Sequence, residues 1–182
     1  PDYLVRLTTG GTIDSTFNLT GAGFNNVVYA IDLQSDGKIL AGGNFTTYNG
    51  ANCPDKLVRL TTGGTHDTTF NTGGVGFNNT VLSVKVQSDG SVLVGGYFTT
   101  YNSVTCPSYF VKLTTGGTID STFNSGGTGF NSDVQTLALQ SDGKILAGGN
   151  FTTYNGANCP DYLVRLTTGG TIDSTFNSGG TG

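Results

Sequence analysis

Apolar and polar residues alternate along several short stretches of the chain, as side chains do on the two faces of a β-strand. In the first clear stretch Tyr29, Ile31 and Leu33 occupy every second position. Asp36-Gly37 follows, and both residues favour tight turns, because aspartate accepts hydrogen bonds from nearby amides and glycine adopts positive φ. The pattern therefore predicts a strand, a hairpin turn and a second strand over Lys38–Phe45.

Further strands are predicted on either side of the threonine- and glycine-rich turns. Lys56–Thr61 is predicted as a third strand, and Thr12–Phe17 as a short fourth strand that follows the turn Thr8–Thr12. The second strand contains Gly42-Gly43, which removes side chains at a place where another sheet could approach closely. Three or four strands joined by tight turns are thus expected in each part of the chain.

The whole pattern recurs every 53 residues without a register slip. The string LVRL, or its variant FVKL, begins at Leu4, Leu57, Phe110 and Leu163. The string QSDG begins at Gln34, Gln87 and Gln140. We therefore expect one repeat domain over 1–182, divided into units 1–53, 54–106, 107–159 and a partial unit 160–182. Three units and a part of a fourth suggest a segment of a longer protein or of an assembly.

This organisation predicts an all-β fold in which each 53-residue unit forms an antiparallel sheet. A unit of about 50 residues with three or four strands matches one blade of a β-propeller. A stacked β-solenoid is the competing arrangement, although its coils are usually shorter and rarely hold two hairpin turns. Closed propellers have about four to eight blades, so three and a half units do not easily close a ring.

Composition supports the all-β prediction and excludes some partners. The chain has 30 glycines and its twelve acidic residues are all aspartate, so it lacks the glutamate typical of long helices. Eight Lys and Arg give a net charge of -4. We therefore expect no nucleic-acid partner, since phosphate binding needs a basic surface. No apolar run approaches the length of a membrane helix, so no membrane insertion is expected.

Two stretches of the sequence resemble a known repeat family. FNNVVYAIDLQSDGKILAGGNFTTYNG, followed by LVRLTTGGTHDTTFN, resembles the delta-60 repeat of bacterial and viral proteins, and the likeness covers all 182 residues in phase. Where that family commonly has Asp-Gly at its second turn, this chain has Gly10-Gly11. The resemblance implies β-propeller-like repeats and an extracellular, cell-surface or virion location. It supplies no catalytic residues.

The residues that could carry catalysis or bind a metal do not form a recognisable motif. His66 is the single histidine, and isoleucine takes its place at Ile13 and Ile119, which favours packing or surface variation over a role as a catalytic base or a ligand. One aspartate lies in each hairpin turn, as at Asp36, and one lies before each Thr-Phe-Asn string, as at Asp14. Calcium needs six to eight oxygens, which a single aspartate per loop does not supply. We therefore predict no enzyme activity, no cofactor and no metal site, and turn formation as the main role of the aspartates.

Three cysteines recur once per unit, at Cys53, Cys106 and Cys159. Zinc motifs place cysteines two to four residues apart, so this spacing does not indicate a zinc site. Free thiols are the first interpretation. Disulfides between neighbouring chains, or within a tightly wound array, are the alternative.

Aromatic residues recur in two different settings. The Phe17, Phe24 and Phe45 columns hold phenylalanine in every full unit, and we expect these rings to form the core between successive sheets. Tyrosine followed by asparagine recurs in the polar loop after the second strand, at Tyr48, Asn49, Tyr101, Asn102, Tyr154 and Asn155. A ring beside an amide suits stacking and hydrogen bonding to a sugar, so these pairs are the candidate ligand-binding residues; loop packing is the alternative.

These features predict a non-enzymatic structural and binding module displayed outside the cell or on a virus particle. Its partner would be a protein or a glycan, bound with avidity by several equivalent loops. The alternative is a purely architectural fibre or shell component whose partners are copies of itself, since open repeat ends favour self-assembly. A catalytic site in a central channel is a third hypothesis, which would need several carboxylates or histidines to converge there.

Overall fold

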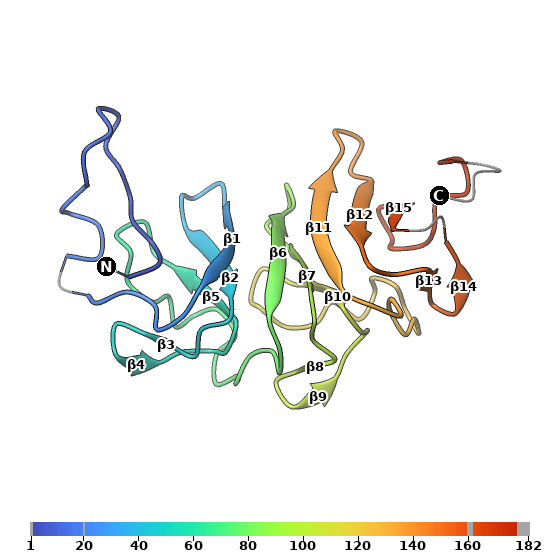
Figure 1. Ribbon diagram of the computed structural model, residues 1–182, viewed down its shortest axis with the longest axis horizontal. Helices are drawn as coiled ribbons and strands as arrows, with labels where there is room; N and C mark the ends of the chain where they lie inside the picture. The colour runs from blue at the N-terminus through green and yellow to red at the C-terminus, as the bar shows by residue number, and fades with distance from the viewer. Residues whose placement is uncertain (1, 20, 160–161, 178–182) are drawn as a thin grey trace.

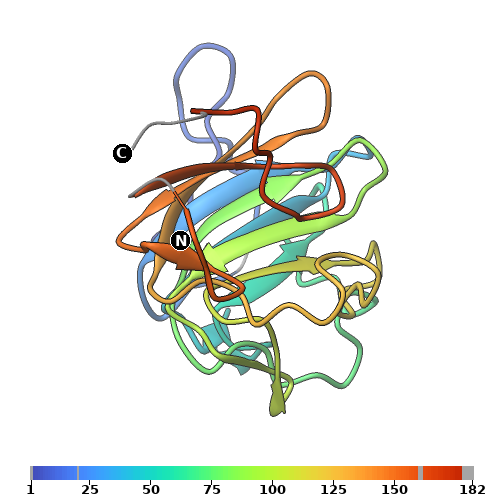
Figure 2. The same cartoon turned by 90° about the vertical axis from the view of Figure 1, so that its right-hand side faces the viewer.

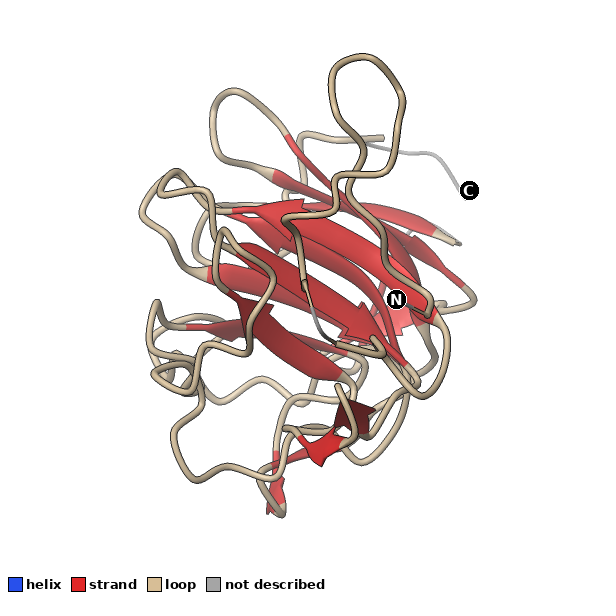
Figure 3. Ribbon diagram, turned by 90° about the vertical axis from the view of Figure 1, so that its left-hand side faces the viewer, coloured by secondary structure: helices blue, strands red, loops and turns tan. Residues whose placement is uncertain are grey.

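The computed structural model describes residues 2–19, 21–159 and 162–177, and every regular element in these ranges is a β-strand (Figures 1 and 3). Three copies of one three-stranded antiparallel sheet lie along the long axis of the molecule (Figure 1). Within the same ranges there is no helix long and apolar enough to cross a membrane. The all-β prediction is therefore confirmed.

The first sheet, called sheet 1, is built from β1 (Val28–Leu33), β2 (Ile39–Gly43) and β5 (Leu57–Leu60), in the order β1-β2-β5. The predicted turn joins β1 to β2: Gly37 has φ 80° and the Asp36 carboxylate accepts a hydrogen bond from the amide of Lys38 at 3.1 Å. A separate small hairpin of β3 (Thr47–Tyr48) and β4 (Ala51–Asn52) connects β2 to β5.

The other two sheets repeat this plan strand for strand. Sheet 2 contains β6 (Val81–Val86), β7 (Val92–Gly96) and β10 (Phe110–Leu113), with the small hairpin β8 (Thr100–Tyr101) and β9 (Val104–Thr105). Sheet 3 contains β11 (Val134–Leu139), β12 (Ile145–Gly149) and β15 (Leu163–Leu166), with the hairpin β13 (Thr153–Tyr154) and β14 (Ala157–Asn158). Even the register irregularity in the first strand recurs, between Val28 and Ala30, Val81 and Ser83, and Val134 and Thr136.

The outer strand of each sheet lies beyond the 53-residue boundary drawn from the sequence. β5 begins at Leu57 and completes a sheet whose other strands lie in the first unit. The predicted fourth strand at Thr12–Phe17 is wrong: only the bridge between Leu7 and Ile13 forms there. The Asp14 carboxylate accepts a hydrogen bond from the Thr16 amide at 2.9 Å, which turns the chain away from a strand.

Successive sheets pack face to face, with the first strands β1, β6 and β11 side by side (Figures 1 and 2). We call the face of each sheet that points toward the N-terminal end of the array its front face, and the opposite face its back face. Polar contacts join the faces: the Asp32 carboxylate accepts a hydrogen bond from the Val86 amide at 2.8 Å, and the Ser83 hydroxyl accepts one from the Leu137 amide at 3.0 Å. The contact surface between sheets is therefore itself a repeated feature.

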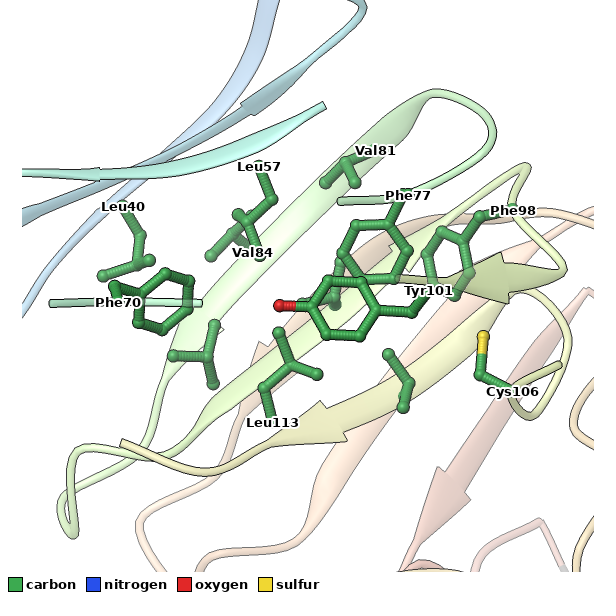
Figure 4. Close-up of a cluster of buried hydrophobic side chains, with 13 residues drawn as sticks. Leu40, Leu57, Phe70, Phe77, Val81, Val84, Phe98, Tyr101, Cys106 and Leu113 are labelled. Carbon is green, nitrogen blue, oxygen red and sulfur yellow. The ribbon is translucent and has the colours of Figure 1, made fainter. Parts of the chain in front are cut away.

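Aromatic rings fill the space between sheets, as the sequence predicted (Figure 4). Phe77 packs against Phe98 and Tyr101, with ring centroids 4.3 and 4.4 Å apart, respectively. Leu40 and Leu57 reach this cluster from the back face of sheet 1. The corresponding phenylalanine columns are buried in every full unit: Phe17, Phe70, Phe123, Phe24, Phe77, Phe130, Phe45, Phe98 and Phe151.

The side chain at the Ile31 position is exposed in sheet 1 but buried in sheets 2 and 3. Val84 and Leu137 are buried because a preceding sheet covers the front faces of sheets 2 and 3, whereas Ile31, in the same column, is exposed. Residues 2–19 precede sheet 1 and form isolated bridges but no paired strand (Figure 3). The strand predicted from Tyr29, Ile31 and Leu33 is confirmed as β1, and its front face is exposed because no sheet of the described chain covers it.

Candidate functional site

The tyrosines of the candidate ligand-binding pairs lie inside the protein. Tyr48, Tyr101 and Tyr154 are buried, and their hydroxyl groups donate hydrogen bonds to the carbonyl oxygens of Gly64, Gly117 and Gly170 at 2.5, 2.6 and 2.8 Å, respectively. Burial raises the pKa of the Tyr48 hydroxyl to about 12. Each ring thus ties the small hairpin to the turn that follows the third strand of the same sheet, which we call the outer turn, and offers no open face for stacking.

The asparagines of the same pairs form an amide clasp between the small hairpin of one sheet and the loop that precedes that sheet. Asn49 and Asn18 donate to each other's side-chain oxygens at 2.6 and 3.0 Å, and the Gly23 amide donates to the Asn49 oxygen at 2.9 Å. The same arrangement recurs at Asn71 with Asn102, and at Asn124 with Asn155. This geometry gives the pairs a structural role, and their use as a ligand site stays a prediction.

The aspartates of the outer turns are held in ion pairs. Asp67 receives hydrogen bonds from the Thr69 hydroxyl and amide at 2.6 and 3.0 Å, and its other oxygen contacts the Arg59 guanidinium at 2.9 Å. Burial opposes ionisation of Asp67, but these hydrogen bonds, with Lys38 and Arg59, outweigh it and hold its pKa well below the usual value. The equivalent residues Asp14, Asp120 and Asp173 also have lowered pKa values and pair with Arg6, Lys112 and Arg165.

These ion pairs explain the recurring aspartates without a metal. In the part of the chain that the structure describes, no group of three or more His, Cys or Asp side chains is placed to hold a metal ion. Arg59 also lies over the Phe70 ring. In the three copies that have arginine at this position, the guanidinium carbon lies 4.7 to 4.9 Å from the centroid of a phenylalanine ring. The outer turn is thus a repeated unit of a basic residue, an aspartate and a phenylalanine, with Lys112 in place of arginine in one copy.

A cleft of about 490 Å³ lies beside this turn. The small hairpin of sheet 1 forms one wall through Asn52, Cys53 and Asp55, and the loop after β5 forms the other through His66 and Thr68. We call it the His66 cleft. Its remaining lining residues are Thr46, Pro54, Phe70, Asn71, Gly73, Gly74 and Val75.

His66 gives this cleft its particular chemistry. Its backbone bridges to Leu60, as Ile13 bridges to Leu7 and Ile119 to Leu113. Burial lowers the pKa of the imidazole, and the nearby Asp67 only partly opposes this effect, so the ring is neutral near pH 7. Its Nε2 atom is buried and has no hydrogen-bond partner among the described residues. An unsatisfied buried nitrogen costs about 1–3 kcal/mol, which a polar ligand atom could recover.

Cys53 lies in the same cleft as His66, but the geometry does not activate it. Burial raises the pKa of the Cys53 thiol to about 12, with a smaller contribution from the charge of Asp55. The thiolate, which is the nucleophile in cysteine chemistry, is therefore scarcely populated at neutral pH. Burial likewise raises the pKa of Cys106 to about 11. Both are free thiols, in agreement with the first interpretation of the cysteines, and Cys159 is buried at the equivalent position.

Smaller clefts lie at equivalent places beside the other outer turns. One of about 220 Å³ is lined by Pro107, Ile119 and Asn124, and one of about 250 Å³ by Ile13, Asn18 and Gly21. The phenylalanine and asparagine of the framework are shared with the His66 cleft, while isoleucine replaces the histidine. The sequence contained one signal for this site, the departure of His66 from its isoleucine column, but it could not show the cleft.

The fold and the comparisons define the class of protein. Three antiparallel sheets of one design, about 53 residues apart and stacked through one repeated contact surface, are β-propeller-type repeats. The model of a family described as a domain of unknown function (DUF5122) with a β-propeller fold matches residues 34–70, 87–123 and 140–176. These matches cover more than half of the chain, which therefore belongs to this family.

One solved structure shows a distant similarity to this chain. It is a protein of unknown function from Bacteroides caccae, 15% identical in sequence, with a TM-score of 0.42. The similarity covers 80% of this chain and 49% of that chain, so this chain spans about half the length of the other protein. No curated protein matches the chain.

Proposed function

We propose that this protein is a non-enzymatic repeat module with a structural and ligand-binding role, and that the His66 cleft binds a neutral, hydroxyl-rich ligand such as a saccharide unit of a glycan. The observation that carries the proposal is the buried, unsatisfied Nε2 of His66 in the wall of a cleft of about 490 Å³. A hydroxyl group donating to this nitrogen would remove the cost of leaving it without a partner.

The chemistry of the cleft supports a neutral polar ligand. Its lining offers an amide from Asn52, hydroxyl groups from Thr46 and Thr68 and one carboxylate from Asp55, all of which suit sugar hydroxyls. It contains no Lys or Arg, so it would not favour an anionic ligand. Val75 is exposed at the rim and supplies an apolar surface on which a pyranose ring could rest.

The raised thiol pKa of Cys53 supports a binding role over a catalytic one. The resemblance to the delta-60 repeat supports placing the module outside the cell or on a virus particle, where a glycan or protein partner would be met. Neither turnover nor a cofactor is part of the proposal. Clefts of the same design beside neighbouring outer turns would let a glycan chain be held at more than one point.

The proposal is tested by titrating a panel of neutral oligosaccharides while recording amide chemical shifts. Binding should shift the amides of Asn52, Cys53 and Asp55 and those of residues 66–75 in the wild-type protein. His66→Ile copies the residue found at the same position in the neighbouring units, so it should fold normally, and we expect it to weaken binding at least about tenfold. Shifts that are equal in the wild type and His66→Ile, or no shifts with any neutral oligosaccharide, would contradict the proposal.

A further inference from the structure

A hollow of about 450 Å³ lies between the hairpin turns of sheets 2 and 3. Gln87 and Ser88, which follow β6, form one wall, and residues 139–143, at the end of β11 and in the turn after it, form the other. We call it the turn hollow. Both walls belong to neighbouring sheets of the described chain.

The equivalent space between sheets 1 and 2 is bridged by Gln34. Its Nε2 atom donates to the Gly90 carbonyl oxygen at 3.3 Å, and its Oε1 atom accepts a hydrogen bond from the Arg59 guanidinium at 3.4 Å. A Cβ atom added to Gly90 would therefore have Gln34 Nε2 at 4.0 Å. Gly143 is the counterpart of Gly90 in sheet 3, and no atom of Gln87 lies within 4 Å of a Cβ atom added there. Gln87 does not bridge the turns as Gln34 does.

Two residues of sheet 2 explain this difference. Ser91 stands where the other units have lysine, and its hydroxyl donates to the Gln87 Oε1 atom at 3.0 Å. Lys112 stands where the other units have arginine, and it pairs with Asp120 at 3.4 Å. Gln87 is thus held against its own turn, and the turn hollow stays open.

Between sheets 1 and 2 a carboxylate of the chain itself crosses the junction. The Asp32 carboxylate accepts a hydrogen bond from the Val86 amide of the next sheet at 2.8 Å. One period later, Lys85 stands in place of Asp32, and the Leu139 amide stands in place of the Val86 amide. Lysine has no acceptor atom, so the Leu139 amide lacks the kind of side-chain partner that Val86 has.

The Leu139 amide points toward sheet 2. The amide of Leu137, two residues earlier in β11, donates to the Ser83 hydroxyl of sheet 2 at 3.0 Å. The amide of Gln140 donates to the Lys144 carbonyl oxygen at 2.9 Å, within its own hairpin. Because alternate amides of a strand point the same way, the Leu139 amide lies on the side of Leu137 and faces the turn hollow, which it lines.

The charges beside the turn hollow favour an anion. Lys85 is partly buried and forms no ion pair with any carboxylate in the part of the chain that the structure describes. Asp142 lines the hollow, but its carboxylate accepts a hydrogen bond from the Lys144 amide at 3.1 Å and lies 3.7 Å from the Lys144 ammonium. One unpaired cation therefore faces one carboxylate that already has a partner.

We propose that the turn hollow binds the carboxylate of a small hydroxylated organic acid, such as a sugar acid, on the Leu139 amide and beside the Lys85 ammonium. A hydrogen bond from a backbone amide to a carboxylate is stronger than one between neutral groups. The Gln87 amide and the hydroxyl groups of Ser88 and Ser141 line the rest of the hollow and suit the hydroxyl groups of such a ligand. This site does not rest on the function proposed above.

The size of the turn hollow agrees with a ligand of this class. Sites for small molecules have volumes of about 300–1,000 Å³, and the hollow of about 450 Å³ lies in this range. The Asp32 carboxylate in the preceding junction shows that such a group fits against the inner strand of the next sheet without disturbing it.

The test is a titration with glucuronate followed by amide chemical shifts, with glucose as the neutral control at matched ionic strength. Glucuronate should shift the amides of Gln87, Ser88 and Leu139. Glucose lacks the carboxylate and should leave the Leu139 amide unmoved, including at concentrations that shift residues 66–75.

Lys85→Gln should weaken glucuronate binding at least about tenfold, because it removes the cation beside the carboxylate. Lys56→Gln removes the same charge from a residue that does not line the hollow, and should bind like the wild type. Lys85→Asp copies Asp32 and supplies a carboxylate of the chain to the Leu139 amide. It should shift this amide without ligand and abolish binding.

A further variant closes the turn hollow without changing Lys85. Ser91→Lys with Lys112→Arg gives sheet 2 the residues of the other units, so Gln87 should bridge to Gly143 and glucuronate binding should weaken. The proposal is overturned if glucuronate does not move the Leu139 amide, if glucose moves it equally, or if Lys85→Gln binds as tightly as the wild type. Unchanged amide shifts in sheet 1 confirm that each variant is folded.

Discussion

Single residues decide how closely the sheets approach. A Cβ atom on Gly42 would lie 2.5 Å from Val81 Cγ1 in the next sheet, and one on Gly95 would lie 2.8 Å from Val134 Cγ1. Real Cβ atoms do not approach this closely, so glycine is required there by the packing of backbone against side chain. The glycine pair of the second strand was expected to mark a close approach, and the structure shows which side chains make it.

Gly42→Ala should therefore destabilise the protein by about 1–3 kcal/mol, the usual cost of overpacking a well-filled core. Gly63→Ala is the matched control, because a Cβ there would meet nothing nearer than the Thr61 hydroxyl at 3.9 Å. Urea unfolding of both variants measures the effect. Equal stability of the two variants would show that the sheets are not in contact at Gly42.

The pairing of Asp67 makes stability depend on pH. Its pKa is lower in the folded protein than in the unfolded chain, so its contribution is complete above the unfolded value of about 4 and is lost as the pH falls toward the folded value. Asp67→Asn should cost about 3 kcal/mol at pH 7, because it leaves the buried Arg59 without its charge partner. The difference from the wild type should shrink below pH 4 in denaturant unfolding, and a difference independent of pH would contradict the account.

The residue types of the site could be found from the sequence only in part. The tyrosine and asparagine pairs stood out by their spacing, but nothing in the sequence showed that the rings enter the core or that each asparagine meets another one 31 residues earlier. His66 was visible as an exception in an isoleucine column. Its place in a cleft with Asp55 depends on how the loop after β5 folds against the small hairpin, which local pattern does not specify.

At the scale of elements, the strands themselves were predictable. Alternation and the Asp-Gly turn located β1 and β2, and the recurring LVRL string located β5. The fourth strand failed because the Asp14 carboxylate binds the backbone of its own turn, a local competitor of strand pairing. The small hairpin of β3 and β4 was hidden in a polar loop, since strands of two residues carry no periodic signal.

The amide clasp should be a measurable link between elements. Asn102 joins the hairpin of β8 and β9 to the loop after Phe70, and its backbone has φ 51°, which glycine tolerates. Asn102→Gly therefore removes the side-chain hydrogen bonds without backbone strain, and should lower the free energy of unfolding by about 1–2 kcal/mol. If these asparagines instead serve only a ligand, thermal and urea unfolding without ligand should be unchanged.

At the scale of the whole molecule, the repeat explains both the fold and its open faces. The sequence predicted one sheet per 53 residues, and the structure confirms three of them with a common register. Burial could not be predicted in the same way, because identical residues are buried or exposed according to whether a neighbouring sheet covers them. Val5 and Val164 also differ because Val164 lies in a strand paired with β12, whereas Val5 has no paired strand among the described residues.

Amide hydrogen exchange followed residue by residue by NMR tests this central claim most directly. In dilute protein the slowest amides should lie in the middle strands β2, β7 and β12, in three matching sets 53 residues apart. The amides of β5, β10 and β15 that pair with these strands should also be slow, while those of residues 4–7, with the sequence of β15, should exchange fast. Equal protection of residues 4–7 and 163–166 in the monomer, or slow amides that do not recur in phase, would contradict the account.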